Sequence, residues 1–168
     1  LKDAGKDVIA VGKIFDIFDG EGVTEKIKTT GNTNGIAFTK ALQTRDFEGL
    51  AFVNLVDFDM LYGHRRDVAG YAAAATEFDH FLADFIPGMR ENDLLMVTAD
   101  HGCDPSYTKT TDHTREYVPY LICGKGVKPG VDLGTKLCFG TIAHTICDYL
   151  GVDASSLDGQ SVLPEILK

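Results

Sequence analysis

Short apolar runs alternate with segments of helical periodicity along this chain, and this alternation restricts the possible folds more than any other feature. Four runs are expected to be buried strands: residues 7–12, 50–59, 93–100 and 117–124. Helices are expected over residues 36–45, 68–86 and 140–151. Strands that alternate with helices are typical of an α/β fold around a largely parallel sheet. We therefore predict that residues 1–168 form a single α/β unit.

The helix over residues 68–86 has the strongest periodicity. Its apolar side chains recur at steps of three and four residues: Val68, Tyr71, Ala75, Phe78, Leu82 and Phe85. Pro87 and Gly88 are expected to end it. Residues 13–35 are rich in Gly, Thr and Asp, which indicates loop with short helical turns. The opening residues 1–5 resemble the tail of a helix that ends at a glycine.

Composition excludes two classes of partner. The net charge of −9 would repel nucleic acid and anionic membranes. No apolar run approaches the roughly 20 residues that a membrane-spanning helix needs. The four cysteines show no CxxC spacing, and Cys123, Cys138 and Cys147 lie among apolar neighbours, as expected of buried thiols in a reducing compartment. The cytoplasm is the expected location.

Acidic and histidine residues follow two of the predicted strands. Asp59 ends one strand, with His64 five residues later, and the pair Asp100–His101 ends the next; His113 lies in the loop that follows. Ligands of open α/β sheets bind beyond the carboxyl ends of the strands. Clustered carboxylates repel one another unless a cation neutralises them, and mixed Asp and His ligands suit Zn²⁺, Mn²⁺ or Fe²⁺. These five residues are nearly enough for two ions.

Several neighbours of these residues have open roles. Asp57 lies on the same strand face as Asp59. Asp104 and Asp112 could orient a ligand imidazole or be plain loop acids. Cys103 could ligate a metal, but five other candidates favour its being a small loop residue. Strand ends also attract acids and histidines as caps, so each candidate alone is ambiguous, whereas all five together favour metal binding.

Other charged residues can be interpreted either as surface or structural residues or as functional ones. Lys13 follows the first predicted strand, where a lysine can bind phosphate as a point charge; a solvated loop lysine is the alternative. Arg65, Arg66 and Arg115 flank the ligand candidates and could bind an anion, although surface charge is the simpler interpretation of each. His80 and His144 fall within predicted helices and are interpreted as structural or surface residues.

Two long segments around the metal candidates resemble a known family. NLVDFDMLYGHRRD (residues 54–67) and TADHGCDPSYTKTTDHTREYVP (98–119) are similar to the phosphopentomutase family of the alkaline phosphatase superfamily. GKIFDIFDGEGVTEKIKT (12–29) and LDGQSVLPEIL (157–167) extend the resemblance over essentially the whole chain. Cys103 departs from the asparagine expected in most members, at a position that is not a ligand.

The resemblance implies a fold and an activity. The fold would be an alkaline-phosphatase-like three-layer sandwich around a largely parallel sheet. The family interconverts ribose 1-phosphate and ribose 5-phosphate, and the 2-deoxy sugars likewise. It uses two Mn²⁺ ions and a phosphorylated threonine. Asp59, His64 and His113 match the ligands of one ion, and Asp100 and His101 match ligands of the other. Lys13 falls in a motif near the substrate phosphate, which favours a role in substrate binding.

The same resemblance implies that this chain is a partial core domain. Family members are roughly twice as long, and their N-terminal part supplies a further metal-binding aspartate, the nucleophilic threonine and, in an insertion, the cap domain. We therefore expect residues 1–168 to be the C-terminal part of the core domain, inactive by themselves. The alternatives are another enzyme of the superfamily, such as a cofactor-independent phosphoglycerate mutase, and a non-catalytic metal-binding domain.

Overall fold

Three parallel strands form the larger sheet of the protein, as described by a computed structural model of residues 1–168. The strands are β1 (Asp7–Val11), β2 (Glu25–Ile27) and β3 (Gly49–Val53), in the order β2-β1-β3. Strand β1 is central, and four of its five residues are buried, as is typical of an apolar strand inside a parallel sheet. Val11 pairs with Val53, so the carboxyl ends of β1 and β3 lie together.

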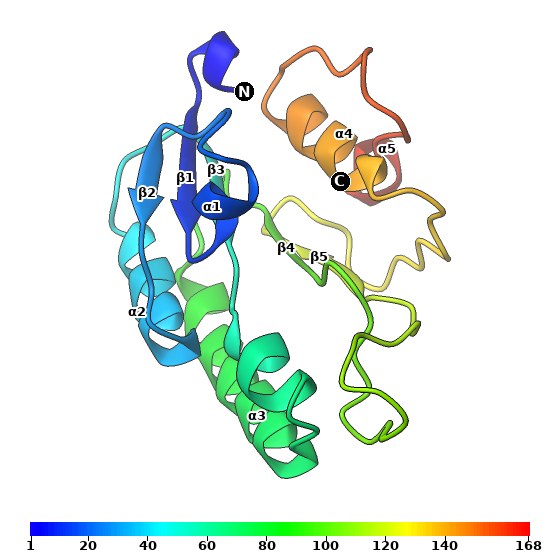
Figure 1. Cartoon of the computed structure of the whole chain (residues 1–168). Helices are drawn as coiled ribbons and strands as arrows, with labels where there is room; N and C mark the ends of the chain where they lie inside the picture. Colours follow the sequence, from blue (N-terminus) through cyan, green and yellow to red (C-terminus); the bar gives the residue numbers. More distant parts are fainter.

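Two helices accompany this sheet. Helix α2 (Asn32–Leu42) packs Leu42 against Ile9 and Val11 in one core cluster. Helix α3 (Val68–Phe85) begins at Asp67, whose carboxylate accepts a hydrogen bond of 2.9 Å from the backbone N–H of Gly70. Figure 1 shows α3 beside α2, with α3 continuing to the lower end of the molecule. The 3₁₀ turn η3 (Ile86–Gly88) follows α3, where Pro87 was expected to end the helix.

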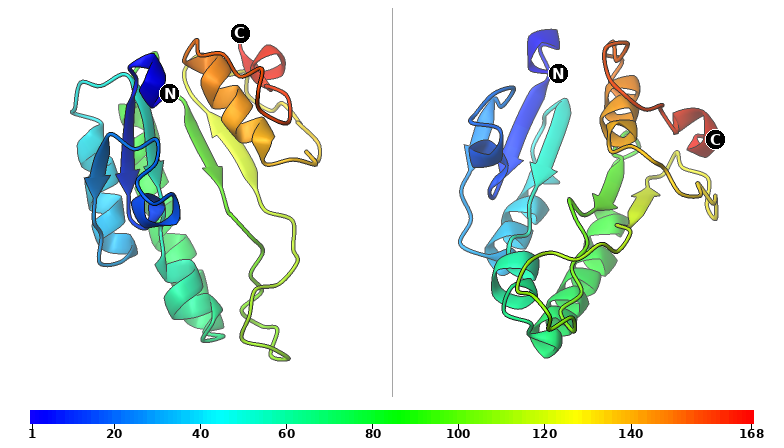
Figure 2. Two further views of the ribbon diagram at one scale, coloured as in Figure 1. Left: turned by 45° about the horizontal axis from the view of Figure 1, so that its top comes forward. Right: turned by 45° about the vertical axis from the view of Figure 1, so that its right-hand side comes forward.

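The remaining strands form a separate antiparallel pair. Strands β4 (Leu95–Thr98) and β5 (Tyr120–Cys123) hydrogen-bond to each other and to no strand of the larger sheet. Helices α4 (Gly140–Tyr149) and α5 (Leu163–Ile166) lie with this pair, apart from the β2-β1-β3 sheet, in both views of Figure 2. A second core cluster joins Val162, Leu163 and Ile166 to apolar side chains of β5 and its neighbours.

The predicted α/β class is confirmed, but several element bounds differ. Strand β3 ends at Val53, six residues before the predicted end, and residues 58–63 form the π-helix η2 (Phe58–Gly63). Residues 13–35 contain the short helix α1 (Ile14–Ile17) and the unpredicted strand β2. The opening residues form the 3₁₀ turn η1 (Lys2–Ala4), closed by Gly5 in the left-handed conformation (φ 75°). The expected largely parallel sheet is parallel only in its three-stranded part.

Large apolar side chains remain exposed on several elements. Leu137 is 95% exposed, Tyr117 87% and Leu121 61%. Only Ala74 of the eighteen residues of α3 is buried, so the periodic apolar stripe expected along this helix is only partly covered. No helix has the combination of length and apolar character that crossing a membrane requires.

Candidate metal centre

The carboxylate of Asp59 lies at the centre of the candidate site. Its Oδ1 atom is 3.3 Å from Nε2 of His64, 3.3 Å from Nε2 of His113 and 4.0 Å from Nε2 of His101. This oxygen is buried, and no group donates a hydrogen bond to it. A buried carboxylate oxygen without a donor is costly, and a cation is the partner that would remove the cost.

Hydrogen bonds to backbone carbonyls fix the orientation of two of these imidazoles. Nδ1 of His64 lies 2.5 Å from the carbonyl oxygen of Thr111, and Nδ1 of His101 lies 3.0 Å from that of Gly102. A carbonyl can only accept, so each Nδ1 donates its proton there, which leaves Nε2 as the ring nitrogen that can bind a metal ion. Nε2 of His64 and Nε2 of His101 both face Oδ1 of Asp59, which is an arrangement suited to ligands of a metal ion.

The three histidines come from separate segments and pack against one another. The rings of His101 and His113 are stacked, with centroids 3.7 Å apart and an angle of 20° between their planes. The ring of His64 lies 5.0 Å from that of His113. Asp59, His101 and His113 offer ligand atoms that all lie within 4.8 Å of one another. Carboxylate and imidazole ligands together suit Zn²⁺, Mn²⁺ or Fe²⁺.

The π-helix η2 explains how Asp59 and His64 reach the same point. The backbone N–H of His64 donates to the carbonyl of Asp59 over 3.0 Å, so the two residues are the ends of one wide turn. Gly63 lets the loop after β4 approach this turn, because a Cβ atom there would lie 2.6 Å from Sγ of Cys103. In Figure 1 the segment after β3 and the loop after β4 both descend to the lower end of the molecule.

Asp100 and Lys13 lie outside the close cluster of Asp59 and the three histidines. The side chain of Asp100 is 75% exposed, and its Oδ1 approaches the site only through Nε2 of His101, at 3.7 Å. Lys13 is exposed. The residue before it, Gly12, lies so close to the carbonyl oxygen of Asn54 that there is no room for a side chain. A Cβ at Gly12 would lie 2.5 Å from that oxygen. Lys13 therefore lies at the same edge of the sheet as the segment that leads to Asp59.

Three acids with open roles now have definite partners. The carboxylate of Asp57 accepts a hydrogen bond of 2.7 Å from the backbone N–H of Asn32, away from the histidines. Asp112 accepts from the backbone N–H of His113 over 2.8 Å, and this bond holds the pKa of Asp112 below its ordinary value. The hydroxyl and N–H of Ser106 lower the pKa of Asp104 in the same way.

The side chain of Cys103 packs against η2 at Gly63. Burial raises the pKa of this thiol, and the negative charge of Asp59 raises it further, against an opposing effect of Arg66. Cys103 is not among the residues whose ligand atoms meet around Asp59. The structure therefore agrees with the interpretation of Cys103 as a small packing residue.

Asn32 is an anchor that sequence reasoning missed. It is 4% exposed, and its Oδ1 accepts a hydrogen bond of 2.9 Å from the backbone N–H of Asp57 while Asp57 accepts from Asn32 in return. The exchange joins the start of α2 to the chain just before Asp59. The signal available in the sequence was the run GNTNG, since asparagine is favoured where helices begin.

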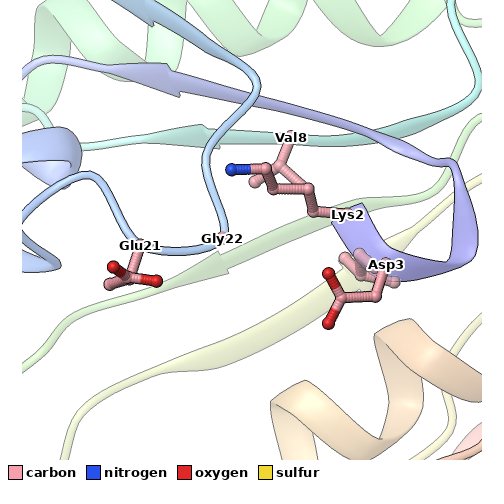
Figure 3. Close-up of a pocket in the computed structure, with 6 residues that line it drawn as sticks. Lys2, Asp3, Val8, Glu21 and Gly22 are labelled. Atoms are coloured by element: carbon pink, nitrogen blue, oxygen red, sulfur yellow. The ribbon is translucent and has the colours of Figure 1, made fainter.

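A separate cavity lies at the opposite end of the larger sheet. It has a volume of about 330 Å³ and is lined by Leu1, Lys2, Asp3, Val8, Glu21 and Gly22. Figure 3 shows one amine and two carboxylates around it, carried by the first turn of the chain and by the loop before β2. These groups lie near the amino end of β1, whereas the metal candidates follow the carboxyl ends of β3 and β4.

A comparison with protein families identifies the group to which these residues belong. A family model described as the metalloenzyme superfamily matches residues 4–154. The chain belongs to the metalloenzyme superfamily. Membership in this superfamily, together with the cluster of Asp59, His101 and His113, indicates a site for a divalent metal ion.

Within the metalloenzyme superfamily, the chain is similar to curated phosphopentomutases along its whole length. It is 53% identical to the phosphopentomutase of Lachnoclostridium phytofermentans over 168 residues, which are 100% of this chain and 43% of that protein. The phosphopentomutase of Acetivibrio thermocellus is 53% identical over 163 residues, covering 97% of this chain and 42% of the relative. That of Symbiobacterium thermophilum is 51% identical over 168 residues, or 42% of its length. The chain thus spans about two fifths of these relatives.

Proposed function

We propose that this chain is the metal-binding, C-terminal part of the core domain of a phosphopentomutase. The full enzyme would interconvert ribose 1-phosphate and ribose 5-phosphate, and the 2-deoxy forms likewise. The observation that carries the proposal is the buried Oδ1 of Asp59, faced by three imidazole nitrogens, in a chain about 50% identical to phosphopentomutases. The cytoplasm is the proposed location.

The proposed metals are two Mn²⁺ ions. Asp59, His64 and His113 would hold one ion, and Asp100 and His101 would contribute to the other. When bound, such a pair of ions offsets the negative charge of a phosphoryl group during its transfer. The carbonyls of Thr111 and Gly102 keep the imidazoles of His64 and His101 in the tautomer that can bind metal. The exposed side chain of Asp100 leaves its carboxylate free to turn toward a second ion.

Lys13 is proposed to bind a phosphate group of the substrate. Its exposed ammonium group lies at the carboxyl edge of the β2-β1-β3 sheet, where the chain continues from β3 toward Asp59. A lysine supplies a point charge that attracts phosphate without fixing its orientation. The phosphorylated threonine and a further metal-binding aspartate are proposed to come from sequence outside residues 1–168.

The rest of the enzyme is proposed to cover surfaces that this chain leaves open. The β4–β5 pair has no hydrogen bonds to the larger sheet, and Leu137, Tyr117 and Leu121 are largely exposed. These exposed side chains are available for apolar contact with another part of the enzyme. The phosphopentomutase relatives have the length to supply such a part, because the chain matches only 42–43% of each. The isolated chain is therefore expected to lack mutase activity.

A chimera tests the proposal. Residues 1–168 replace the matching segment of the Lachnoclostridium phytofermentans phosphopentomutase, and the chimera and the isolated chain are assayed with ribose 1-phosphate and Mn²⁺. We expect turnover by the chimera and none by the isolated chain. Turnover by the isolated chain would show that the missing part is dispensable. A chimera that folds and binds Mn²⁺ but converts only phosphoglycerate would place the chain with a different mutase. A chimera that folds, binds Mn²⁺ and converts neither substrate would favour the non-catalytic domain.

A further inference from the structure

Arg66 makes an unusual set of hydrogen bonds to one loop. Its Nε and Nη2 atoms donate to the carbonyl oxygen of Thr110 over 2.9 and 2.6 Å, and Nη1 donates to that of Asp104 over 3.1 Å. Nη2 also donates to the carbonyl of Asp112. The guanidinium group therefore contacts three backbone carbonyls between residues 104 and 112. It has no acidic side chain within ion-pair distance, so it is engaged by backbone and not by a carboxylate.

The position of Arg66 connects this loop to the turn that carries the metal candidates. The backbone N–H of Arg66 donates to the carbonyl of Gly63, the last residue of η2, over 3.1 Å. Two residues earlier, His64 contacts the carbonyl of Thr111, between the carbonyls of Thr110 and Asp112 that Arg66 holds. His113 follows directly. The side chains of His64 and Arg66 thus both contact the backbone carbonyls of residues 110–112.

The backbone of Arg66 is itself held in a costly conformation. Its φ angle is 56°, and Asp19 is the only other residue besides glycine with a positive φ. The left-handed region costs energy for a residue with a side chain, so surrounding contacts must hold it there. Glycine at this position would avoid the cost but would remove the guanidinium group. An arginine in this backbone conformation is explained if its side chain contacts offset the cost.

We propose that Arg66 is a positioning residue that holds loop 104–113 so that the imidazole of His113 faces the carboxylate of Asp59. The inference rests on the proposed metal site and extends it to a residue that contacts neither metal nor substrate. Arginine suits the task because its planar guanidinium presents five N–H donors in fixed directions. A lysine has three donors, but they lie on one nitrogen and cannot reproduce the spread of the guanidinium fork. Four of the five N–H donors of Arg66 already bind carbonyl oxygens, which leaves one for any other group.

Mn²⁺ binding tests the proposal, with Arg65 as the matched control. Arg65 is exposed and its side chain makes no hydrogen bond or ion pair, so R65M removes the same charge without loosening the loop. We expect R66M and R66K to weaken Mn²⁺ binding, measured by electron paramagnetic resonance titration, by about tenfold to a hundredfold, the range typical of residues that orient metal ligands. R65M should bind as the wild type does. Equal affinities of R66M and R65M would overturn the proposal.

A double-mutant comparison separates positioning from a general loss of stability. If Arg66 acts through His113, R66M should not weaken Mn²⁺ binding further in a chain that already carries H113A. A full additional loss in the H113A background would overturn the proposal. R66G, which relieves the backbone cost while removing the side chain, provides a second variant should R66M fold poorly. It is expected to weaken binding as R66M does, and wild-type affinity of R66G would count against the proposal.

Hydrogen exchange provides a readout that does not depend on metal. In the metal-free protein, we expect amide hydrogens of residues 104–113 to exchange faster in R66M and R66G than in R65M, because the loop has lost its anchor. Unchanged exchange would refute the anchoring role. If the wild-type chain binds no Mn²⁺ but the variants show the expected exchange pattern, the proposed metal site is wrong and the anchoring of loop 104–113 by Arg66 still holds. The two failures can therefore be told apart.

Discussion

Oδ1 of Asp59 has no hydrogen-bond donor, so the substitution D59N should have opposite effects on stability without and with metal. In the metal-free protein, Oδ1 is buried without a hydrogen-bond donor and faces Nε2 of His64 and Nε2 of His113. D59N places an amide N–H at this position, 3.3 Å from Nε2 of His64 and of His113, where it can donate. The variant should therefore be more stable than the wild type without metal. It should also lose the charge that a metal ion requires.

The burial of Asp59 sets the size of the first effect, and mass action sets the size of the second. Satisfying a buried polar atom recovers about 1–3 kcal/mol, and the lower end applies because the Asp59 side chain as a whole is 33% exposed. A gain of about 1 kcal/mol raises Tm by about 2–4 °C for a chain of this size. Mn²⁺ at about 100 times its Kd stabilises the wild type by about 2.7 kcal/mol, or about 5–10 °C. D59N should show little of this second shift.

Differential scanning calorimetry in EDTA and in excess Mn²⁺ measures both shifts in one experiment. D79N is the control, because Asp79 is an exposed residue of α3 that forms no ion pair. It should behave as the wild type under both conditions. The reasoning is refuted if D59N has a lower Tm than the wild type in EDTA. Equal stabilisation of D59N and wild type by Mn²⁺ would refute the assignment of Asp59 as a ligand.

Three further predictions concern the elements that carry the site. N32A should lower the free energy of unfolding by about 1–3 kcal/mol in urea titrations, because the backbone N–H of Asp57 would lose its acceptor; a change within error would contradict the anchoring role. D67A should cost about 1 kcal/mol by the same measurement, because it removes the cap of α3, and an unchanged midpoint would argue against the cap. The hydrogen bonds from Arg45 hold the pKa of Glu25 below its ordinary value, so this pair stabilises the fold at pH above the unfolded-state pKa of Glu25 and loses that contribution as pH falls through the lower folded-state pKa. R45Q should raise the pKa of Glu25 toward its ordinary value in an NMR titration, and an unmoved pKa would exclude Arg45 as the cause.

Local sequence determined most of the secondary structure. The periodic apolar side chains of residues 68–86 predicted α3 almost to its bounds, because a helix of this length repeats the same signal several times. The buried run at residues 7–11 likewise identified β1. Strand β2 was missed because three residues carry too little periodicity, and β3 was predicted too long because apolar side chains continue into the π-helix η2.

The sequence by itself also determined which residues could bind metal, because the carboxylate of Asp and the imidazole of His can bind a metal ion at any position in the chain. Only the tertiary structure decided how close they come. Asp59, His64, His101 and His113 converge because a π-turn, a glycine contact and two carbonyl hydrogen bonds bring separate segments together. The roles of Asn32 and Arg66 belong to the same class: each binds backbone groups dozens of residues away. Backbone groups are the same in every residue, so a single sequence does not identify which of them a distant side chain will contact.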